Sequence, residues 1–303
     1  MLLISTSQLK YFRMKFFNYI LSSAAVATLV LIGCSMTGGN SISDGNIKDA
    51  TVKKTVKISN FSKIDAATGI RVIYSQGKST GTAQIATTPS AEKYLKVYVK
   101  DGTLVARYEN KGSNNIKGPS IVTVSSTTLS EVDLSSAARL QVNGNLDISS
   151  LEIDMSSASK ATFNDITAKE IEIDLSSSAN VEIGTANVDK LDAELSSASR
   201  LEVSKAVATN LFLETSSAAK ILVGYFNGTG IEADASSGSN ISVSDMTATK
   251  AYAEASSGSK VTLKGRCEHV NKDASSGGKV DISQLEVPNL PQKSSRKHQP
   301  RNP

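Results

Sequence analysis

The chain has 303 residues, of which 39% are hydrophobic and 20% charged, and its formal net charge is +4. The positive excess comes from the two ends: three Lys and Arg lie in residues 1–34 and four in residues 289–303, which leaves 26 in the body against all 29 Asp and Glu. A mildly acidic body without a basic patch excludes a nucleic-acid partner, and two cysteines exclude a disulfide scaffold. The sequence also contains no zinc spacing, phosphate loop or dinucleotide fingerprint.

The first element in chain order is an export signal, residues 1–34. Lys15 follows Met14, and an apolar run over residues 19–32 ends just before Cys34. A positive start, a short apolar core and a small residue before cysteine are typical of a secretory signal. The segment resembles the lipobox of bacterial lipoproteins, which makes Met14 the expected initiator and Cys34 the expected lipidation site. An apolar signal with an incidental cysteine is the alternative. Residues 35–50, rich in Gly and Ser, are expected to form a flexible tether.

Residues 51–130 contain short alternating runs without a fixed period. Apolar and polar residues alternate in residues 70–74, 95–99, 104–108 and 121–124, which predicts strands. Asp101-Gly102 fits a two-residue hairpin turn between the second and third of these. Because a solenoid needs a cap over the open end of its core, we expect this segment to form an irregular N-terminal β cap.

Residues 131–288 carry a tandem repeat. A Ser-Ser pair recurs eight times, at spacings of 21, 20, 20, 20, 20, 20 and 19 residues. The pairs begin at Ser135, Ser156, Ser176, Ser196, Ser216, Ser236, Ser256 and Ser275. A period near 20 residues is typical of a solenoid, in which each repeat makes one coil and buries its apolar face against its neighbours.

Within one repeat, the apolar residues fall into three stretches. Leu151, Ile153 and Met155 alternate with polar residues, a shorter alternation follows at 161–163, and a third apolar position is Ile166. Spacing by two excludes an amphipathic helix, and the signatures of leucine-rich and calcium-roll repeats are absent. The predicted fold is all-β: a right-handed parallel β-helix of about 20-residue coils with an irregular N-terminal β cap.

Stacked coils place like residues in two columns. The acid column, two residues before each Ser-Ser pair, is Asp133, Asp154, Asp174, Glu194, Glu214, Asp234, Glu254 and Asp273. The basic column, four residues after the first Ser, is Arg139, Lys160, Asn180, Arg200, Lys220, Asn240, Lys260 and Lys279. Unit charges about 5 Å apart in water repel by somewhat under 1 kcal/mol, so we expect the basic column to offset the acid column.

The acid column has two interpretations. The plain one is a solvated face that keeps the solenoid soluble. The functional one is a strip that binds a cation, with Ca²⁺ as the candidate cofactor, or lies along a polysaccharide. No other cofactor is predicted.

The C-terminal part offers few candidates for chemistry. Residues 289–303 are basic and rich in proline and are expected to be a disordered tail. Cys267 is expected to be a small buried filler rather than a reactive thiol, close to where other repeats place Val188 or Met246. The repeat is least regular at residues 224–230 and 264–270. If the chain has an active site, its candidate side chains are Tyr225, Tyr252, Arg266 and His269.

Three features resemble a known family. They are residues 61–64 (Phe-Ser-Lys-Ile), residues 69–74 (Gly-Ile-Arg-Val-Ile-Tyr) and the serial small-residue bends from Ser135 to Gly278. Together they resemble the head GIN domain family of auto-transporter adhesins, over residues 61–282. Several bends here are Ser-Ser-Ala-Ser, whereas the family tends toward Ser-Gly-Ser-Gly. The resemblance implies a β-helix on the envelope of a Gram-negative cell with a binding or adhesive role, and it supplies no catalytic residues.

These observations predict a non-enzymatic lipoprotein, anchored to the outer membrane, that binds polysaccharide, cell-surface or envelope partners. One alternative is a polysaccharide-degrading enzyme with two carboxylates as acid and base, and another is a structural envelope spacer. Enzymes on repeat scaffolds usually interrupt the repeat with loops, and insertions here total about one residue. The periplasmic and surface-exposed sides of the membrane both stay open, as does the oligomeric state.

Overall fold

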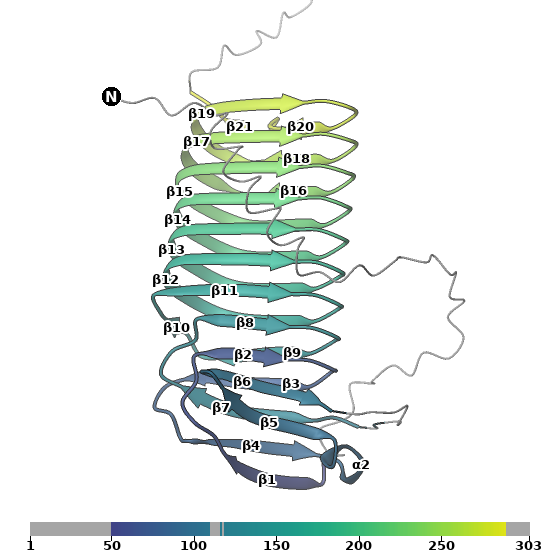
Figure 1. Cartoon of the computed structure of the whole chain (residues 1–303). Coiled ribbons are helices and arrows are strands. Elements are labelled where there is room, and N and C mark those ends of the chain that lie inside the picture. Colours follow the sequence, from purple (N-terminus) through teal and green to yellow (C-terminus); the bar gives the residue numbers. More distant parts are fainter. Residues whose placement is uncertain (1–49, 110–115, 117, 289–303) are drawn as a thin grey trace, which may run out of the picture. The chain divides into compact units, whose positions relative to one another are not determined.

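The computed structural model describes residues 50–109, 116 and 118–288 (Figure 1). The export signal, Cys34, the tether before residue 50 and the basic tail lie outside the described residues. The described part is a β-solenoid with about 20-residue coils, and its one short helix is α2 (Pro89–Glu92). No helix in these ranges has the length and apolar character needed to span a bilayer.

The strands fall into three groups. The N-terminal group comprises β1 (Val52–Lys57), β2 (Lys63–Ala66), β3 (Arg71–Gln76), β4 (Thr82–Thr87), β5 (Leu95–Lys100), β6 (Thr103–Tyr108) and β7 (Ile121–Ser126). The regular coils comprise β8 (Glu131–Leu134), β9 (Arg139–Asn143), β10 (Leu146–Asp147), β11 (Ser150–Met155), β12 (Lys160–Leu175), β13 (Asn180–Leu195), β14 (Arg200–Thr215) and β15 (Lys220–Ala235). The last coils comprise β16 (Asn240–Val243), β17 (Met246–Ala255), β18 (Lys260–Leu263), β19 (Gly265–Ala274), β20 (Lys279–Asp281) and β21 (Leu285–Glu286).

From β12 to β15, each coil is one continuous strand with two corners. In β12, residues 164 and 165 are both exposed, as are 169 and 170, so the inward–outward alternation changes phase twice. The pairing of β12 with β13 skips residues 164 and 169. The coil therefore has three segments, 160–163, 165–168 and 170–175, and the three predicted apolar stretches are confirmed. Pairing with the next coil resumes directly after each corner.

The coils stack parallel and in register, as Figure 1 shows. From β12 to β15, each paired residue lies opposite the residue twenty positions further along the chain. Inward side chains therefore form columns of their own, and Ile173, Ala193 and Leu213 are each at most 2% exposed. This apolar burial stabilises each coil only through contact with the adjacent coils, because no residue reaches across several repeats.

The Ser-Ser segments form the bends between coils. In residues 176–179, Ser177 and Ser178 have φ of 49° and 64°, and the Ala179 N–H donates to the Ser176 carbonyl at 3.0 Å. Two left-handed residues define a type I′ turn, which costs about 1–2 kcal/mol for each residue with a Cβ. The Ser178 N–H also donates to the Ser197 carbonyl of the next bend at 3.0 Å. This bond between bends, repeated along the stack, offsets the strain.

One coil is stacked out of sequence order. β2 pairs parallel with both β6 and β8, and β3 pairs parallel with both β7 and β9. Residues 63–76 therefore lie between the coil of β6 and β7 and the coil that begins at residue 131. The chain leaves this coil, forms β4 to β7, and only then starts the regular repeat, which explains why no period is visible in this segment.

Antiparallel strands lie at the N-terminal end of the stack. β4 pairs antiparallel with β7 and β1, and β5 pairs antiparallel with β6 (Figure 1). The Asp101-Gly102 turn between β5 and β6 has φ of 50° and 76°, so the predicted hairpin is confirmed. Such antiparallel strands break the parallel pairing that an open end would offer to another chain.

The 19-residue spacing arises at Gly265. Leu263 and Arg266 pair with Val243 and Thr247 of the preceding coil. Two residues lie between the first pair of positions and three between the second, so this coil is one residue shorter. Gly265 has φ of 107°, and a Cβ there would lie 2.3 Å from the Met246 carbonyl oxygen, so only glycine fits. The shortened coil keeps its packing. Cys267 is fully buried opposite Ala248, in the column of Val188, which confirms its predicted role as a filler.

Candidate functional site

Two outward faces flank the row of bends. The pre-bend face consists of the outward side chains of residues 170–175 and their equivalents in other coils. The post-bend face consists of those of residues 160–163 and their equivalents. Because alternate residues of a strand point to opposite sides, each coil adds a side chain to every outward column of a face.

The structure assembles the acid column on the pre-bend face. All eight predicted carboxylates lie opposite one another in adjacent coils, from Asp133 to Asp273. Asp65 adds a ninth, because β2 pairs with β8 and places Asp65 opposite Asp133. Sequence analysis missed Asp65, since its coil lies outside the period. The available signal was the apolar–acid–apolar triplet at residues 64–66, which matches residues 132–134.

A second column of acids lies beside the first and was also missed. It sits two residues earlier in each strand, with members opposite one another in adjacent coils. Its members are Glu131, Glu152, Glu172 and Asp192. With Asp133, Asp154, Asp174 and Glu194 they make a block of eight carboxylates, which we call the acid block. The signal was visible, because two acids alternate with apolar residues in each of these repeats.

Crowding and burial perturb the acid block. Loss of solvation, followed by repulsion from Glu194 and Glu172, raises the pKa of Asp174 from 3.8 to about 7. Loss of solvation, followed by repulsion from Asp65, raises the pKa of Asp133 to about 6. Both causes disfavour the ionised carboxylate. Near neutral pH, the carboxyl group of Asp174 is therefore protonated in a fraction of the molecules. The remaining ionised carboxylates can accept cations or hydrogen-bond donors.

Cations lie at the margins of the acid block. Lys190 Nζ lies 2.8 Å from Glu170 Oε1 and 3.2 Å from Asp192 Oδ2. At the N-terminal end, Arg107 Nη2 donates to Asp65 Oδ2 at 2.5 Å, and Lys63 pairs with Glu131. These half-exposed pairs limit the repulsion where the columns end.

Three side chains of the basic column form ion pairs on the post-bend face, not with the acid column on the pre-bend face. Lys160 pairs with Glu182 at 2.6 Å and Arg200 with Glu202 at 2.9 Å, both across the post-bend face. Lys260 lies 4.0 Å from Asp281 on the same face. For these three side chains, the expectation that the basic column offsets the acid column was wrong. The bend between the columns turns the chain, so residues six apart in sequence project from different faces.

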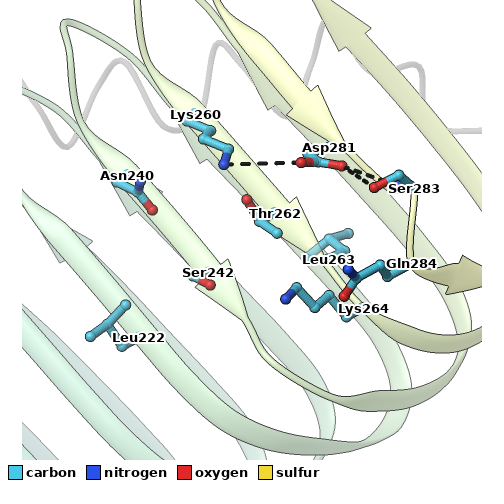
Figure 2. Close-up of a pocket in the computed structure, with 10 residues that line it drawn as sticks. All are labelled: Leu222, Asn240, Ser242, Lys260, Thr262, Leu263, Lys264, Asp281, Ser283 and Gln284. Atoms are coloured by element: carbon cyan, nitrogen blue, oxygen red, sulfur yellow. Dashed lines mark hydrogen bonds and ion pairs between the residues drawn. The ribbon is translucent and has the colours of Figure 1, made fainter.

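The post-bend face carries a polar hollow of about 380 Å³ near its C-terminal end. Figure 2 shows Asp281 between Lys260 and Ser283, with the small side chains of Ser242 and Thr262 below. The Ser283 hydroxyl and N–H donate to Asp281 Oδ1 at 2.7 and 3.2 Å, and these bonds lower the pKa of Asp281. This carboxylate is already satisfied. Because Lys264 and Gln284 also line the hollow, it combines charged and neutral hydrogen-bonding groups.

The pre-bend face carries a groove of about 410 Å³, which we call the aromatic groove. Phe212 and Tyr252 line it, with Gly230 and His269 beside them. Of the four candidate side chains, Tyr252 and His269 therefore lie together, whereas Tyr225 and Arg266 are not among the groove's lining residues.

Within residues 50–109, 116 and 118–288, no group of three or more His, Cys, Asp and Glu side chains is arranged to hold a metal ion. Cys267 is also unsuited to nucleophilic chemistry. Burial raises the pKa of its thiol, and its Sγ donates to the His269 carbonyl at 3.1 Å.

Comparisons with known proteins agree with the fold. The family model described as "Putative auto-transporter adhesin, head GIN domain" matches residues 60–227 and 212–295. A solved structure of a "putative lipid binding protein" from Parabacteroides distasonis is 17% identical, with a TM-score of 0.68, covering 76% of this chain and 96% of that one. A "putative adhesin" from Parabacteroides merdae is 18% identical, with a TM-score of 0.61 and coverage of 76% and 95%. A "putative adhesin" from Bacteroides fragilis is 20% identical, with a TM-score of 0.54 and the same coverage. No curated protein sequence matches the chain.

Proposed function

The chain belongs to the head GIN domain family of auto-transporter adhesins, and on that premise we propose that it is a non-enzymatic binding protein of the cell envelope. A lipid on Cys34 would anchor it to the outer membrane, and the pre-bend face would meet its partner. Support for the anchor is the lipobox-like sequence that ends at Cys34.

The continuity of the acid column carries this proposal. From residue 131 to residue 274, each coil adds one carboxylate at the same position, without an inserted loop on that face. A surface that repeats every coil is suited to an extended partner that makes the same contact many times. Active sites instead require a local set of different groups held in one geometry.

The partner is expected on the surface of the solenoid. Fully buried side chains such as Phe163 and Phe226 occupy its interior, which is packed along the coils. A polysaccharide or a surface protein lying along the coil axis would meet both the acid block and the aromatic groove. Cations such as Ca²⁺ would strengthen the contact if they bridge the carboxylates to oxygen atoms of the partner.

Two matched triple variants test the proposal. D174N/E194Q/E214Q removes three carboxylates from the acid column, and E182Q/E202Q/D281N removes three from the post-bend face. The mature chain carrying Cys34→Ser would be incubated with isolated cell envelopes, with Ca²⁺ or with a chelator, and its retention measured. We expect only the first triple variant to lose retention. Equal retention of both triple variants would refute the assignment of the face.

The anchor needs its own measurement. With Cys34 intact, a fatty-acid label is expected in the chain, and the protein is expected in the membrane fraction. With Cys34→Ser both are expected to be lost. A native chain that stays soluble and unlabelled would contradict lipidation.

A polysaccharide-degrading activity is the second candidate, favoured by one observation. The raised pKa of Asp174, beside Glu172 and Glu194, is a property that a general acid needs. Incubation with soluble polysaccharides distinguishes the two functions. Release of reducing ends by the native chain, abolished by Asp174→Asn, would replace the binding proposal with an enzymatic one. A chain that neither binds nor cleaves would be a structural spacer.

A further inference from the structure

The aromatic groove differs from the rest of the pre-bend face in its side chains. Phe212 and Tyr252 occupy the column that holds Glu131, Glu152, Glu172 and Asp192 in earlier coils. Glu232 lies between them, one coil from each. The acid block therefore gives way to two aromatic rings separated by one carboxylate. This change occurs only where the groove lies.

A missing side chain opens the groove. Gly230 lies in the neighbouring column, between Asn210 and Lys250. Its φ is not left-handed, and a Cβ there would approach only Asn210 Oδ1, at 3.0 Å. Neither the backbone nor the packing therefore requires glycine at this position. The missing side chain leaves space beside the two aromatic rings, and the fold itself does not require that space.

The two rings are held by charged neighbours. Tyr252 Oη donates to Glu254 Oε2 in the acid column at 2.8 Å, and this bond, followed by loss of solvation, raises the pKa of Tyr252 to about 12. Lys190 Nζ lies 5.8 Å from the centre of the Phe212 ring. Coils about 4.8 Å apart place the two aromatic positions about 10 Å apart along the axis, a length comparable to a disaccharide unit.

The surrounding charge selects among ligands. Glu232 lies inside the groove and the acid column runs beside it through Asp234 and Glu254. A chain of uronates or sulfated sugars would bring its charges against these carboxylates. Asn210, Lys250 and Asn271 supply hydrogen-bond donors on the other sides of the groove. The combination suits a ligand with many hydroxyl groups, flat apolar faces and no negative charge.

We propose that the aromatic groove binds a neutral, extended glycan chain lying along the coil axis. The rings of Phe212 and Tyr252 stack on the apolar faces of two sugar units, and Glu232 accepts hydrogen bonds from hydroxyls between them. Lys250 and the two asparagines donate to hydroxyl oxygens at the sides. This inference rests on the proposed binding function and names its site and ligand class.

Calorimetric titration of the mature chain carrying Cys34→Ser tests the inference. The probes are linear hexasaccharides of β-1,4-linked glucose, mannose and N-acetylglucosamine, and an anionic hexagalacturonate. F212A/Y252A removes both rings, and Gly230→Asn fills the groove with the residue that the preceding coil carries. Tyr225→Ala is the matched control, because it removes an aromatic side chain outside the groove. Circular dichroism melting of each variant shows whether it folds.

We expect at least one neutral hexasaccharide to bind and hexagalacturonate not to bind. F212A/Y252A is expected to abolish binding, Gly230→Asn to weaken it about tenfold or more, and Tyr225→Ala to leave it unchanged. Failure of every neutral probe to bind the folded native chain would overturn the inference, as would unchanged binding by F212A/Y252A and Gly230→Asn. The envelope-retention assay distinguishes failure of this site from failure of the proposed function. If both groove variants are retained like the native chain, only the glycan site is refuted. If the native chain itself is not retained, the proposed function is refuted.

Discussion

Replacement of Asp174 by Asn tests whether the acid block stores electrostatic repulsion. Its carboxyl group is half-buried, with Asp154 and Glu194 opposite it in the adjacent coils. Loss of solvation and repulsion from these and other carboxylates raise its pKa from 3.8 to about 7. The native chain therefore carries a penalty at high pH that the unfolded chain lacks. Asn has nearly the same shape and no charge, so the variant escapes the penalty.

The size of the effect follows from that difference in pKa. At 1.36 kcal/mol per pKa unit, a change from 3.8 to about 7 corresponds to about 4 kcal/mol. Because the carboxyl group keeps contact with water and salt screens its neighbours, we expect about 1–2 kcal/mol to remain. For a protein of this size, 1 kcal/mol shifts the melting midpoint by about 2–4 °C. Asp174→Asn should therefore melt about 2–8 °C above the native chain at pH 8.

The stability gained by Asp174→Asn should depend on pH. Between pH 4 and 7, the folded chain binds more protons at Asp174 than the unfolded chain, so the stability of the native protein falls as pH rises through this window. The advantage of Asp174→Asn should be absent below about pH 4 and complete above about pH 7.

Melting curves followed by circular dichroism at pH 4, 6 and 8 measure this effect. Asp281→Asn is the matched control, because hydrogen bonds from Ser283 lower the pKa of Asp281 and its loss should destabilise the chain at pH 8. Equal midpoints for Asp174→Asn and the native chain at pH 8 would refute the reasoning. So would a difference that is the same at pH 4 and pH 8.

Three further predictions concern salt, the shortened coil and the end of the stack. Raising NaCl from about 20 to about 500 mM at pH 8 should raise the native midpoint more than that of Asp174→Asn, and equal shifts would show that the carboxylate feels little repulsion. Gly265→Ala should lose more than about 2 kcal/mol in urea unfolding, because its Cβ would meet the Met246 backbone, whereas Gly77→Ala should change stability by less than about 0.5 kcal/mol. Lys272 pairs with the buried Ala253 at an inward position of the last coil, so Lys272→Val should cause concentration-dependent association in sedimentation, while the outward Lys220→Val should not. A monomeric Lys272→Val would refute the role of this charge at the end of the solenoid.

The sequence predicted the regular coils well because one period equals one coil. The Ser-Ser spacing alone places Asp174 opposite Glu194 and Glu214 one coil further, and the structure confirms these pairings. The coil that contains Asp65 obeys no such rule. Its strand β2 pairs with β6 and β8, whose partner residues are 40 and 68 positions away, and such unequal separations leave no periodic signal.

Directions around a coil were harder to predict than positions along it. Column membership follows from spacing, but whether two columns face each other depends on the turn between them. Lys160 and Arg200 are only six residues from the acid column, yet two left-handed bend residues send them to another face. The aromatic groove required structural information too. Spacing already places Phe212, Glu232 and Tyr252 in one column, but the hollow beside their side chains is seen only in the structure.

The central claim is that the pre-bend face meets the partner, and photo-crosslinking tests it directly. A photoreactive amino acid would replace either Asp192 on the pre-bend face or Leu222 on the post-bend face, and each chain would be irradiated with the neutral hexasaccharide that binds. The account predicts a covalent adduct from position 192 and none from position 222. Adducts from position 222 alone, or equal adducts from both, would contradict it.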